Sequence, residues 1–218
     1  MEKMKRFWLQ SKGMGIMFFL PLLGYILFIP LCVMFLNKNV EEVGPRFFTA
    51  QQMCYQFIPI LSTIWMYMFQ REYVEGEGRE ILILGGKIPL FSFIYWILNL
   101  PFIWVSIHML KDTEGHREDL FYEMLIVSFM ICGLVFFLNF ATNSIAQSLL
   151  LVVLDIWLSN VDIENILVFR NGLQDVQRAS SYFYVILKGG GLFSEQAAVY
   201  IIMGVLFWLG GLFKARRL

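Results

Sequence analysis

The fold class is decided by the run Leu120–Phe140, LFYEMLIVSFMICGLVFFLNF. A bilayer core of about 30 Å is crossed by roughly 20 apolar residues in helical form, and this continuous run has that length. Other apolar stretches lie on both sides of it: Met14–Leu36, Phe47–Phe69, Ile88–Leu110, Ile145–Leu158 and Ala197–Phe213. The short Ile145–Leu158 reaches about 18 positions when it is extended back to Ala141. The sequence therefore predicts an all-α polytopic membrane protein in which residues 1–218 form one transmembrane domain of six helices.

The composition excludes a soluble globular domain. Hydrophobic residues make up 58% of the chain and charged residues 16%, whereas soluble domains average about 25% charged residues. A chain of this size has too much surface to hide such an apolar excess. Lys+Arg and Asp+Glu both number 17, so the net charge favours neither nucleic acid nor a strongly anionic partner. Cys32, Cys54 and Cys132 lie in apolar runs without a CxxC pattern, which indicates buried thiols rather than a metal site or a disulfide framework.

The basic ends of the chain predict its orientation. Residues 1–13 place Met4, Phe7 and Trp8 on one helical face among basic residues, which predicts an amphipathic helix in the membrane interface; the alternative is a disordered basic tail. The apolar run that follows is longer than a signal-peptide core and lacks a small-residue cleavage site, so we expect a retained first helix. Both termini are predicted to be cytoplasmic because most basic loop residues lie on their side: Lys3, Lys5, Arg6, Lys12, Arg71, Arg79, Lys87, Lys214, Arg216 and Arg217.

Polar side chains inside the apolar runs are candidates for a substrate path. We take Asp155 as the only carboxylate well inside such a run, and an unpaired carboxylate in a membrane is costly enough to mark a functional group. Its place near the outer end of the short fifth helix equally fits a side chain that reaches the interface. Asn99 and Asn139 add amides to the third and fourth predicted helices, where hydrogen bonds between helices are the commoner role of such groups.

The segment between the second and third predicted helices, residues 70–87, has a composition unlike its surroundings. It reads QREYVEGEGREILILGGK, an acidic stretch followed by the short apolar turn Ile81–Leu84. An acidic connector that runs into a short amphipathic helix is suited to docking on a soluble partner. The alternative is a solvated loop between two membrane helices.

This connector resembles the cytoplasmic loop of ABC-2-type permeases, the membrane subunits of bacterial ABC exporters. In that family a loop with recurring Glu, a Gly and a small apolar helix joins the second and third membrane helices. The matching residues are Glu72, Glu75, Gly76, Glu80 and Leu82. The layout is also similar, with an amphipathic N-terminal helix, six spans and a basic tail. A long external loop, residues 159–196, precedes the last span and predicts a re-entrant or interfacial segment, although the family's usual Pro near Ser181 is absent.

The resemblance implies a permease subunit of an ATP-driven exporter in a bacterial plasma membrane. Such a subunit forms the translocation path for an amphiphilic or peptide-like substrate, pairs with a second permease subunit, and couples through Glu72, Glu75, Gly76, Glu80 and Leu82 to separate ATPase subunits. ATP and Mg would be bound by those partners. The chain itself has no P-loop, because Ile81 and Ile88 stand where the first Gly and the Ser or Thr are needed around Gly85-Gly86-Lys87. We therefore expect no catalytic residue, metal or cofactor in this chain.

Two alternatives are from other functional classes. Transporters driven by an ion gradient usually carry several intramembrane charges and internal repeats, and here Asp155 is one candidate charge and no repeat is convincing. The motif EExxxR at Glu41, Glu42 and Arg46 is similar to that of CAAX-protease-like intramembrane proteases, but it lies in a predicted external loop, and His108 and His116 are poorly placed to join it. A membrane enzyme of another kind or a scaffold ranks third.

Overall fold

The computed structural model describes residues 15–75, 88–160 and 195–215, with only the backbone at 72, 155–160 and 195–196. Helices cover nearly all of these residues and no strand occurs among them, so the predicted all-α class is confirmed. The predicted interfacial helix 1–13, the connector 76–87 and most of the loop 159–196 lie outside the described residues. The principal helices beyond the first span are α4 (Val43–Val74), α6 (Ile88–Met109), α7 (Arg117–Thr142), α8 (Ile145–Asn160) and α10 (Glu195–Ala215).

The first helix, Gly15–Asn39, changes its winding along its length. It comprises η1 (Gly15–Phe19), α2 (Leu20–Leu23), the π-helical η2 (Gly24–Phe28), α3 (Ile29–Leu36) and η3 (Asn37–Asn39). Proline lacks an N–H, and its ring meets the carbonyl four residues earlier, so a regular α-helix cannot pass through Pro30 undisturbed. For Pro30 that carbonyl belongs to Ile26, and Ile26 lies inside the wider π turn Gly24–Phe28. The π turn thus accompanies Pro30 in this helix.

In the part of the chain that the structure describes, four helices are long and apolar enough to cross a membrane: Gly15–Asn39, Ile88–Met109, Arg117–Thr142 and Ala197–Ala215. Each coincides with a predicted span within a few residues, which supports the membrane-protein class. The other two predicted spans are helices whose passage through a membrane stays a prediction. α4 contains all of Phe47–Phe69 but interrupts it with glutamines, and the apolar part of α8 in the described chain, Ile145–Leu154, is shorter than a span.

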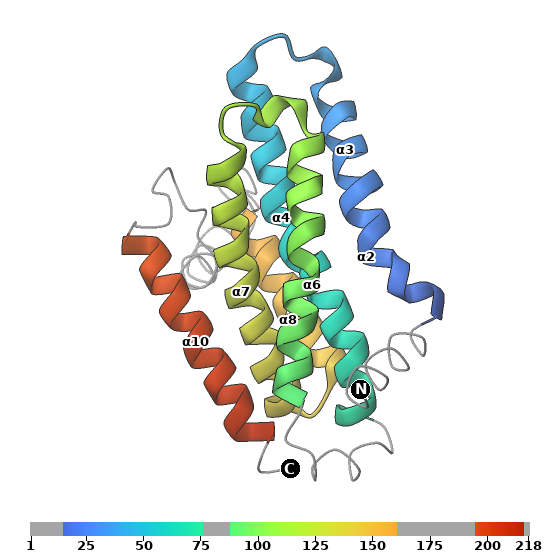
Figure 1. Cartoon of the computed structure of the whole chain (residues 1–218), viewed down its shortest axis with the longest axis vertical. Coiled ribbons are helices and arrows are strands. Elements are labelled where there is room, and N and C mark those ends of the chain that lie inside the picture. The colour runs from blue at the N-terminus through green and yellow to red at the C-terminus, as the bar shows by residue number, and fades with distance from the viewer. Residues whose placement is uncertain (1–14, 76–87, 161–194, 216–218) are drawn as a thin grey trace, which may run out of the picture.

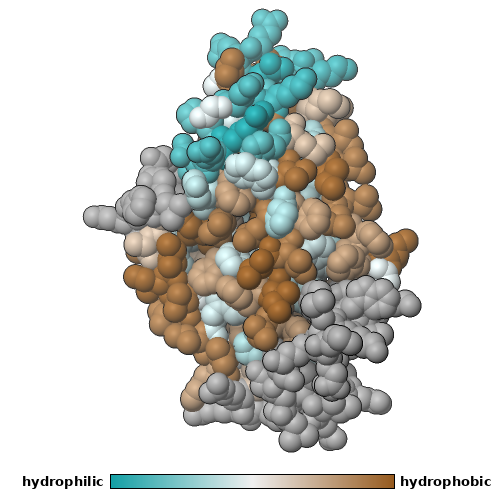
Figure 2. Space-filling model, in the orientation of Figure 1, coloured by the Kyte–Doolittle hydropathy of each residue, from teal (hydrophilic) through white to brown (hydrophobic). Residues whose placement is uncertain are grey.

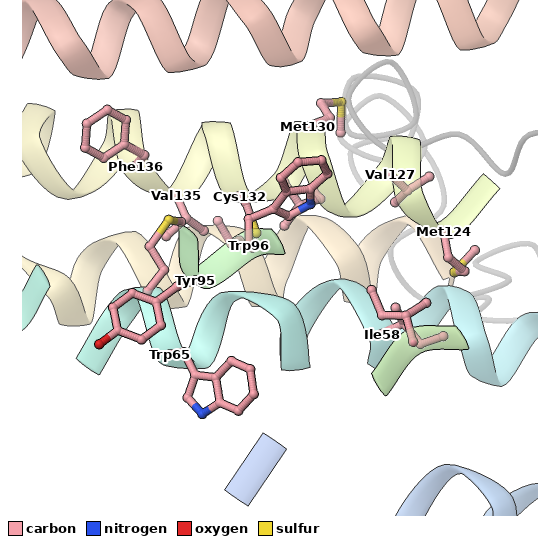
Figure 3. Close-up of a cluster of buried hydrophobic side chains, with 14 of the residues drawn as sticks. Ile58, Trp65, Tyr95, Trp96, Met124, Val127, Met130, Cys132, Val135 and Phe136 are labelled. Carbon is pink, nitrogen blue, oxygen red and sulfur yellow. The ribbon is translucent and has the colours of Figure 1, made fainter. Parts of the chain in front are cut away.

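Helix α7 is the centre of the bundle and packs against α4, α6, α8 and α10 (Figure 1). Side chains of α7 such as Met124, Val127, Cys132 and Val135 lie in the core, where Ile58 of α4 and other side chains join them (Figure 3). All five of these side chains are nearly or completely inaccessible to solvent. Because α7 is enclosed by other helices, its polar residues are the ones most able to act between helices rather than on lipid.

Helix α10 lies against α7 through small residues. Its buried positions follow helical spacing: Ala197, Tyr200, Gly204, Trp208 and Gly211. A Cβ at Gly204 would lie 2.7 Å from the Phe129 ring, and one at Gly133 would lie 2.9 Å from the Gly204 carbonyl oxygen. Small residues at such a seam let two membrane helices approach closely enough for dispersion contacts to hold them together. The opposite face of α10 carries exposed Ile202, Leu206 and Leu209, which suits contact with lipid.

The two ends of the bundle differ in character. At one end, here the Arg46 end, the turn before α4 meets the turn between α6 and α7, and polar residues gather there (top of Figures 1 and 2). The Asn37 amide donates to Asp112 Oδ2 at 2.9 Å and to the Arg46 carbonyl at 3.1 Å, and Arg46 Nε lies 3.8 Å from Asp112 Oδ1. At the opposite end, here the Glu75 end, α4 finishes beside the start of α8. Large apolar side chains are exposed on the bundle between the two ends.

Candidate functional site

Polar side chains of α4 meet α7 at three heights along the bundle. Near the Arg46 end Tyr55 donates to Glu123 at 2.9 Å. In the middle Ser62 Oγ lies 3.6 Å from Cys132 Sγ, and towards the Glu75 end the Asn139 amide donates to Gln70 Oε1. Hydrogen bonds between membrane helices contribute modestly each, about 0.6 kcal/mol on average. This polar α4–α7 contact is the candidate functional site because it places polar groups inside the otherwise apolar core.

Glu123 is the carboxylate of this contact. Its side chain is 5% exposed on α7, and its Oε2 accepts from the Tyr55 hydroxyl and, at 3.5 Å, from the Gln51 amide. Both donors are neutral and both lie on α4. Within the described ranges no Lys, Arg or His forms an ion pair with it. This carboxyl group is thus enclosed between α4 and α7, and no described residue supplies a compensating cation.

Beside the middle of the site, at Ser62, hydrogen bonds join the first helix, α4 and α6. Asn99 of α6 is fully buried, and its amide donates to the Ser62 carbonyl at 3.1 Å and to the Tyr95 carbonyl at 2.7 Å. Tyr25 of the first helix donates to Asn99 Oδ1 at 3.1 Å. Ser62 Oγ in turn donates to the Pro59 carbonyl at 2.7 Å. With its amide and carbonyl both engaged, Asn99 holds helices together at a place where prolines disturb the backbone.

Gln70 links α4 to two further helices. Its amide donates to Ser92 Oγ of α6 at 2.8 Å, and its oxygen accepts from Asn139 of α7. Gln70 is fully buried and α4 continues to Val74, so the first residues of the predicted connector form the last turn of this helix. Asn139 Oδ1 is buried without a hydrogen-bond partner among the described residues. The Asn139 amide group therefore forms a hydrogen bond while its Oδ1 does not, so a rearrangement of the α4–α7 contact could bring a donor to this oxygen.

Glu75 joins the end of α4 to the beginning of α8. Its Oε1 accepts from the Ile145 backbone N–H at 2.8 Å, and its Oε2 lies 4.0 Å from Arg71 Nε. The first N–H groups of a helix have no partner within the helix, and they carry a partial positive charge that favours a carboxylate. Ser144 supplies a second acceptor, since its Oγ lies 3.4 Å from the Gln147 N–H. Glu75 thus links the end of α4 to the first turn of α8.

The residues predicted from sequence are distributed over different parts of the molecule. Asn99 and Asn139 contact α4 at Ser62 and Gln70, which are about 12 Å apart along a helix that rises 1.5 Å per residue, so they do not form one pocket lining. Asp155 lies on α8 and Glu72 in the last turns of α4, where the structure describes the backbone alone. Gly76, Glu80 and Leu82 lie outside the described residues, and the roles predicted for all these residues stay predictions.

Glu123 was missed by the sequence reasoning, which named Asp155 as the only carboxylate well inside an apolar run. Glu123 lies within the predicted span Leu120–Phe140, and that position was a sufficient signal. Its partners could not have been read from the sequence, because Tyr55 is 68 positions away. Gln70 was read as part of the connector for the same reason: a glutamine at the end of an apolar run is ambiguous until its partners are known.

The residues of the protease-like motif do not form a site with the histidines. Glu41 and Glu42 are exposed before α4, and Arg46 is engaged with Asp112. His108 lies 3.0 Å from the Trp104 carbonyl of its own helix, and the His116 ring packs on Phe47. In residues 15–75, 88–160 and 195–215 no group of three or more His, Cys, Asp or Glu could hold a metal ion.

No protein-family model, curated protein or solved structure matches this chain.

Proposed function

We propose that the chain is the membrane subunit of an ATP-driven exporter of the ABC-2 type. The observation that carries the proposal is the bond between Glu75 and the start of α8. Residues 76–87 join α4 to α6, and Glu75 immediately precedes them, so a partner that moves this connector acts on α4, α6 and α8 together. The resemblance of the connector to the coupling loop of ABC-2-type permeases gives the kind of partner, a separate ATPase subunit.

In this proposal α4 and α7 move relative to each other at the polar α4–α7 contact. Rocking of α4 against α7 exchanges bonds at Glu123, Cys132 and Asn139, while the glycine seam between α7 and α10 stays closed. Small changes at a connector become larger ones when packed helices have two alternative arrangements. ATP binding by the partner would thus open and close a path beside α4 for an amphiphilic or peptide-like substrate.

The proposal includes a membrane setting and a second permease subunit. The Glu75 end and both termini are cytoplasmic, the Arg46 end is external, and the membrane is a bacterial plasma membrane. α4 and α8 complete six spans with the four apolar helices. α8 exposes Leu150, Leu151 and Leu154, and the first helix exposes Leu31 and Phe35, which supports burial of these faces by lipid or by the second subunit.

The test is co-expression with an ATPase that carries Walker motifs and is encoded beside this chain. We expect the two proteins to purify together, and the double variant E75A/E80A to lose the ATPase or its stimulation by the permease. The control E114A/E118A removes two carboxylates at the Arg46 end and leaves both unchanged. Unchanged co-purification and hydrolysis in E75A/E80A would refute the coupling role, and hydrolysis that the membrane subunit never alters would refute the exporter.

An ion-gradient transporter is the second candidate, and Glu123 is the observation that favours it. Buried carboxylates in membrane helices commonly belong to ion or proton pathways. Transport by the chain alone in vesicles, driven by an imposed ion gradient and abolished by E123Q or D155N, would select this function. Transport that requires the ATPase and ATP would select the exporter.

A further inference from the structure

Glu123 carries an inference that goes beyond the proposed function. Its side chain is 5% exposed, within a helix long and apolar enough to cross a membrane. Both of its hydrogen bonds, from Tyr55 and Gln51, reach the same oxygen, Oε2, and none from the described residues reaches Oε1. The two donors are neutral, so they orient the carboxyl group without balancing a negative charge.

The charged groups that the structure describes near Glu123 do not form an ion pair with it. Asp119, one turn earlier on α7, is a second carboxylate and not a cation. The other charged residues described at this end, including those of η4 (Lys111–Thr113), form no ion pair with Glu123: Lys38, Glu41, Glu42, Arg46, His108, Lys111, Asp112, Glu114, His116, Arg117 and Glu118. Of Asp155 on α8 only the backbone is described. Among the described residues, an ionised Glu123 would therefore be a buried charge without an ion-pair partner, which is strongly unfavourable.

We propose that Glu123, Tyr55 and Gln51 form a proton-binding site between α4 and α7. In the protonated group Oε2 is the carbonyl oxygen, which accepts from Tyr55 and Gln51, and Oε1 carries the proton. This assignment places the acceptor on the oxygen that the two donors reach. No covalent bond other than O–H forms or breaks. Protonation leaves the α4–α7 contact neutral, and release of the proton places a charge inside it.

The site is where proton uptake and helix movement would be linked. An ionised carboxylate draws water or a cation, and either would have to enter between α4 and α7. Proton release therefore loosens this contact, and proton uptake closes it. The chain alone suffices to test for the bound proton, so failure of the ATPase experiment and failure of this proposal are distinguishable.

The test is infrared difference spectroscopy of the full chain in phosphatidylcholine vesicles at neutral pH. A protonated carboxyl group has a C=O stretching band that shifts when H₂O is replaced by D₂O. We expect this band in the wild-type chain and its loss in Glu123→Gln. The controls Glu118→Gln, an exposed carboxylate on the same helix, and Asp155→Asn should retain the Glu123 component.

A second variant, Tyr55→Phe, tests the proposal even if Glu123→Gln does not fold. Tyr55→Phe removes a hydrogen bond to the carbonyl oxygen but leaves the proton, so the band should remain and move to higher wavenumber. Absence of the band in the wild-type chain, its persistence in Glu123→Gln, or its loss only in Asp155→Asn would each overturn the proposal. A band that Tyr55→Phe leaves at the same wavenumber would contradict the assignment of Oε2 as the acceptor.

Discussion

The two faces of α7 are built from different chemistry. Towards α10 the helix presents Gly133 and the rings of Phe129 and Phe136, and α10 presents Gly204 and Gly211. Towards α4 it presents Glu123, Cys132 and Asn139, and each of them contacts a polar side chain of α4. The first face has close shape complementarity, whereas the second has individual hydrogen bonds at separate heights.

This difference indicates which contact is permanent and which can change. Close packing through glycine tolerates little displacement, because dispersion contacts fall off steeply with distance. Hydrogen bonds between membrane helices are individually weak, and alternative partners can replace them. We infer that α7 and α10 move as a unit and that movement, where it occurs, is between this unit and α4. The substitutions below break or sharpen the comparison, from the largest expected effect to the smallest.

Gly204→Leu should have the largest effect on stability, because it disrupts the α10 face. Even a Cβ would lie 2.7 Å from the Phe129 ring and 3.3 Å from Met130 Cα, so a leucine forces the two helices apart. Overpacking of this kind costs about 3 kcal/mol at the upper end of its range. The free energy of unfolding, from titration with sodium dodecyl sulfate followed by tryptophan fluorescence, measures it. Val205→Leu, on the exposed face of α10, should change it by less than about 0.5 kcal/mol. Equal effects of the two substitutions would contradict the claim that Gly204 allows α10 to pack closely on α7.

Two substitutions of Glu123, on the α7 face that contacts α4, should distinguish the loss of the side chain from the loss of its acidic group. Glu123→Ala removes the acceptor of the Tyr55 and Gln51 donors and leaves a void, at a cost of about 2 kcal/mol. Glu123→Gln keeps an oxygen acceptor and replaces the acid O–H by an N–H donor, so a change below about 0.5 kcal/mol is expected at neutral pH. The same titration gives both values. A large loss in Glu123→Gln would mean that the group needs its charge.

Asn139→Ala should cost about 1 kcal/mol, because Gln70 Oε1 loses a donor in a buried place. The loss should be less than additive with Gln70→Ala, which a double-mutant cycle of unfolding free energies measures. Gln147→Ala, an exposed side chain on α8, is the control without effect. Additive losses would show that the two amides act separately.

Glu75→Gln should have the smallest effect on stability, about 0.5 kcal/mol, because a partly exposed carboxylate at a helix start is screened by solvent. The loss should shrink as salt is added, since the interaction is electrostatic. Glu114→Gln, exposed at the other end, should show neither the loss nor the salt dependence. A loss of several kcal/mol or one insensitive to salt would contradict the capping role.

Long apolar runs made most of the fold predictable. Leu120–Phe140 and three other stretches correspond to helices with the length and composition of membrane spans, because lipid demands about 20 apolar residues wherever the chain crosses. The predicted helix Phe47–Phe69 lies within α4. Because glutamines interrupt its apolar run, its passage through a membrane stays a prediction. Gln70 closes an apolar run and looks like the start of a loop, yet its bonds to Ser92 and Asn139 hold it inside the bundle.

The candidate site was predictable only in its residue types. Asn99 and Asn139 were identified as amides inside helices, and the structure shows that each contacts α4, at different heights. Glu123 was overlooked although it lies within the predicted span Leu120–Phe140. Its significance depends on Tyr55, from a helix far away in sequence, and on the absence of an ion-pair partner among the described residues. Pairings of this kind are set by packing, which a single sequence does not reveal.

The central claim is that the connector end of α4 faces the cytoplasm, where an ATPase can reach it. Labelling of single cysteines with a membrane-impermeant maleimide tests this directly, in a chain that also carries Cys32→Ala; Cys54 and Cys132 are fully buried. Arg71→Cys reports on the Glu75 end and Glu41→Cys on the Arg46 end, and both positions are exposed. We predict that Glu41→Cys is labelled in intact cells and that Arg71→Cys is labelled only in inverted membrane vesicles. Labelling of Arg71→Cys in intact cells would place the connector outside and contradict the account.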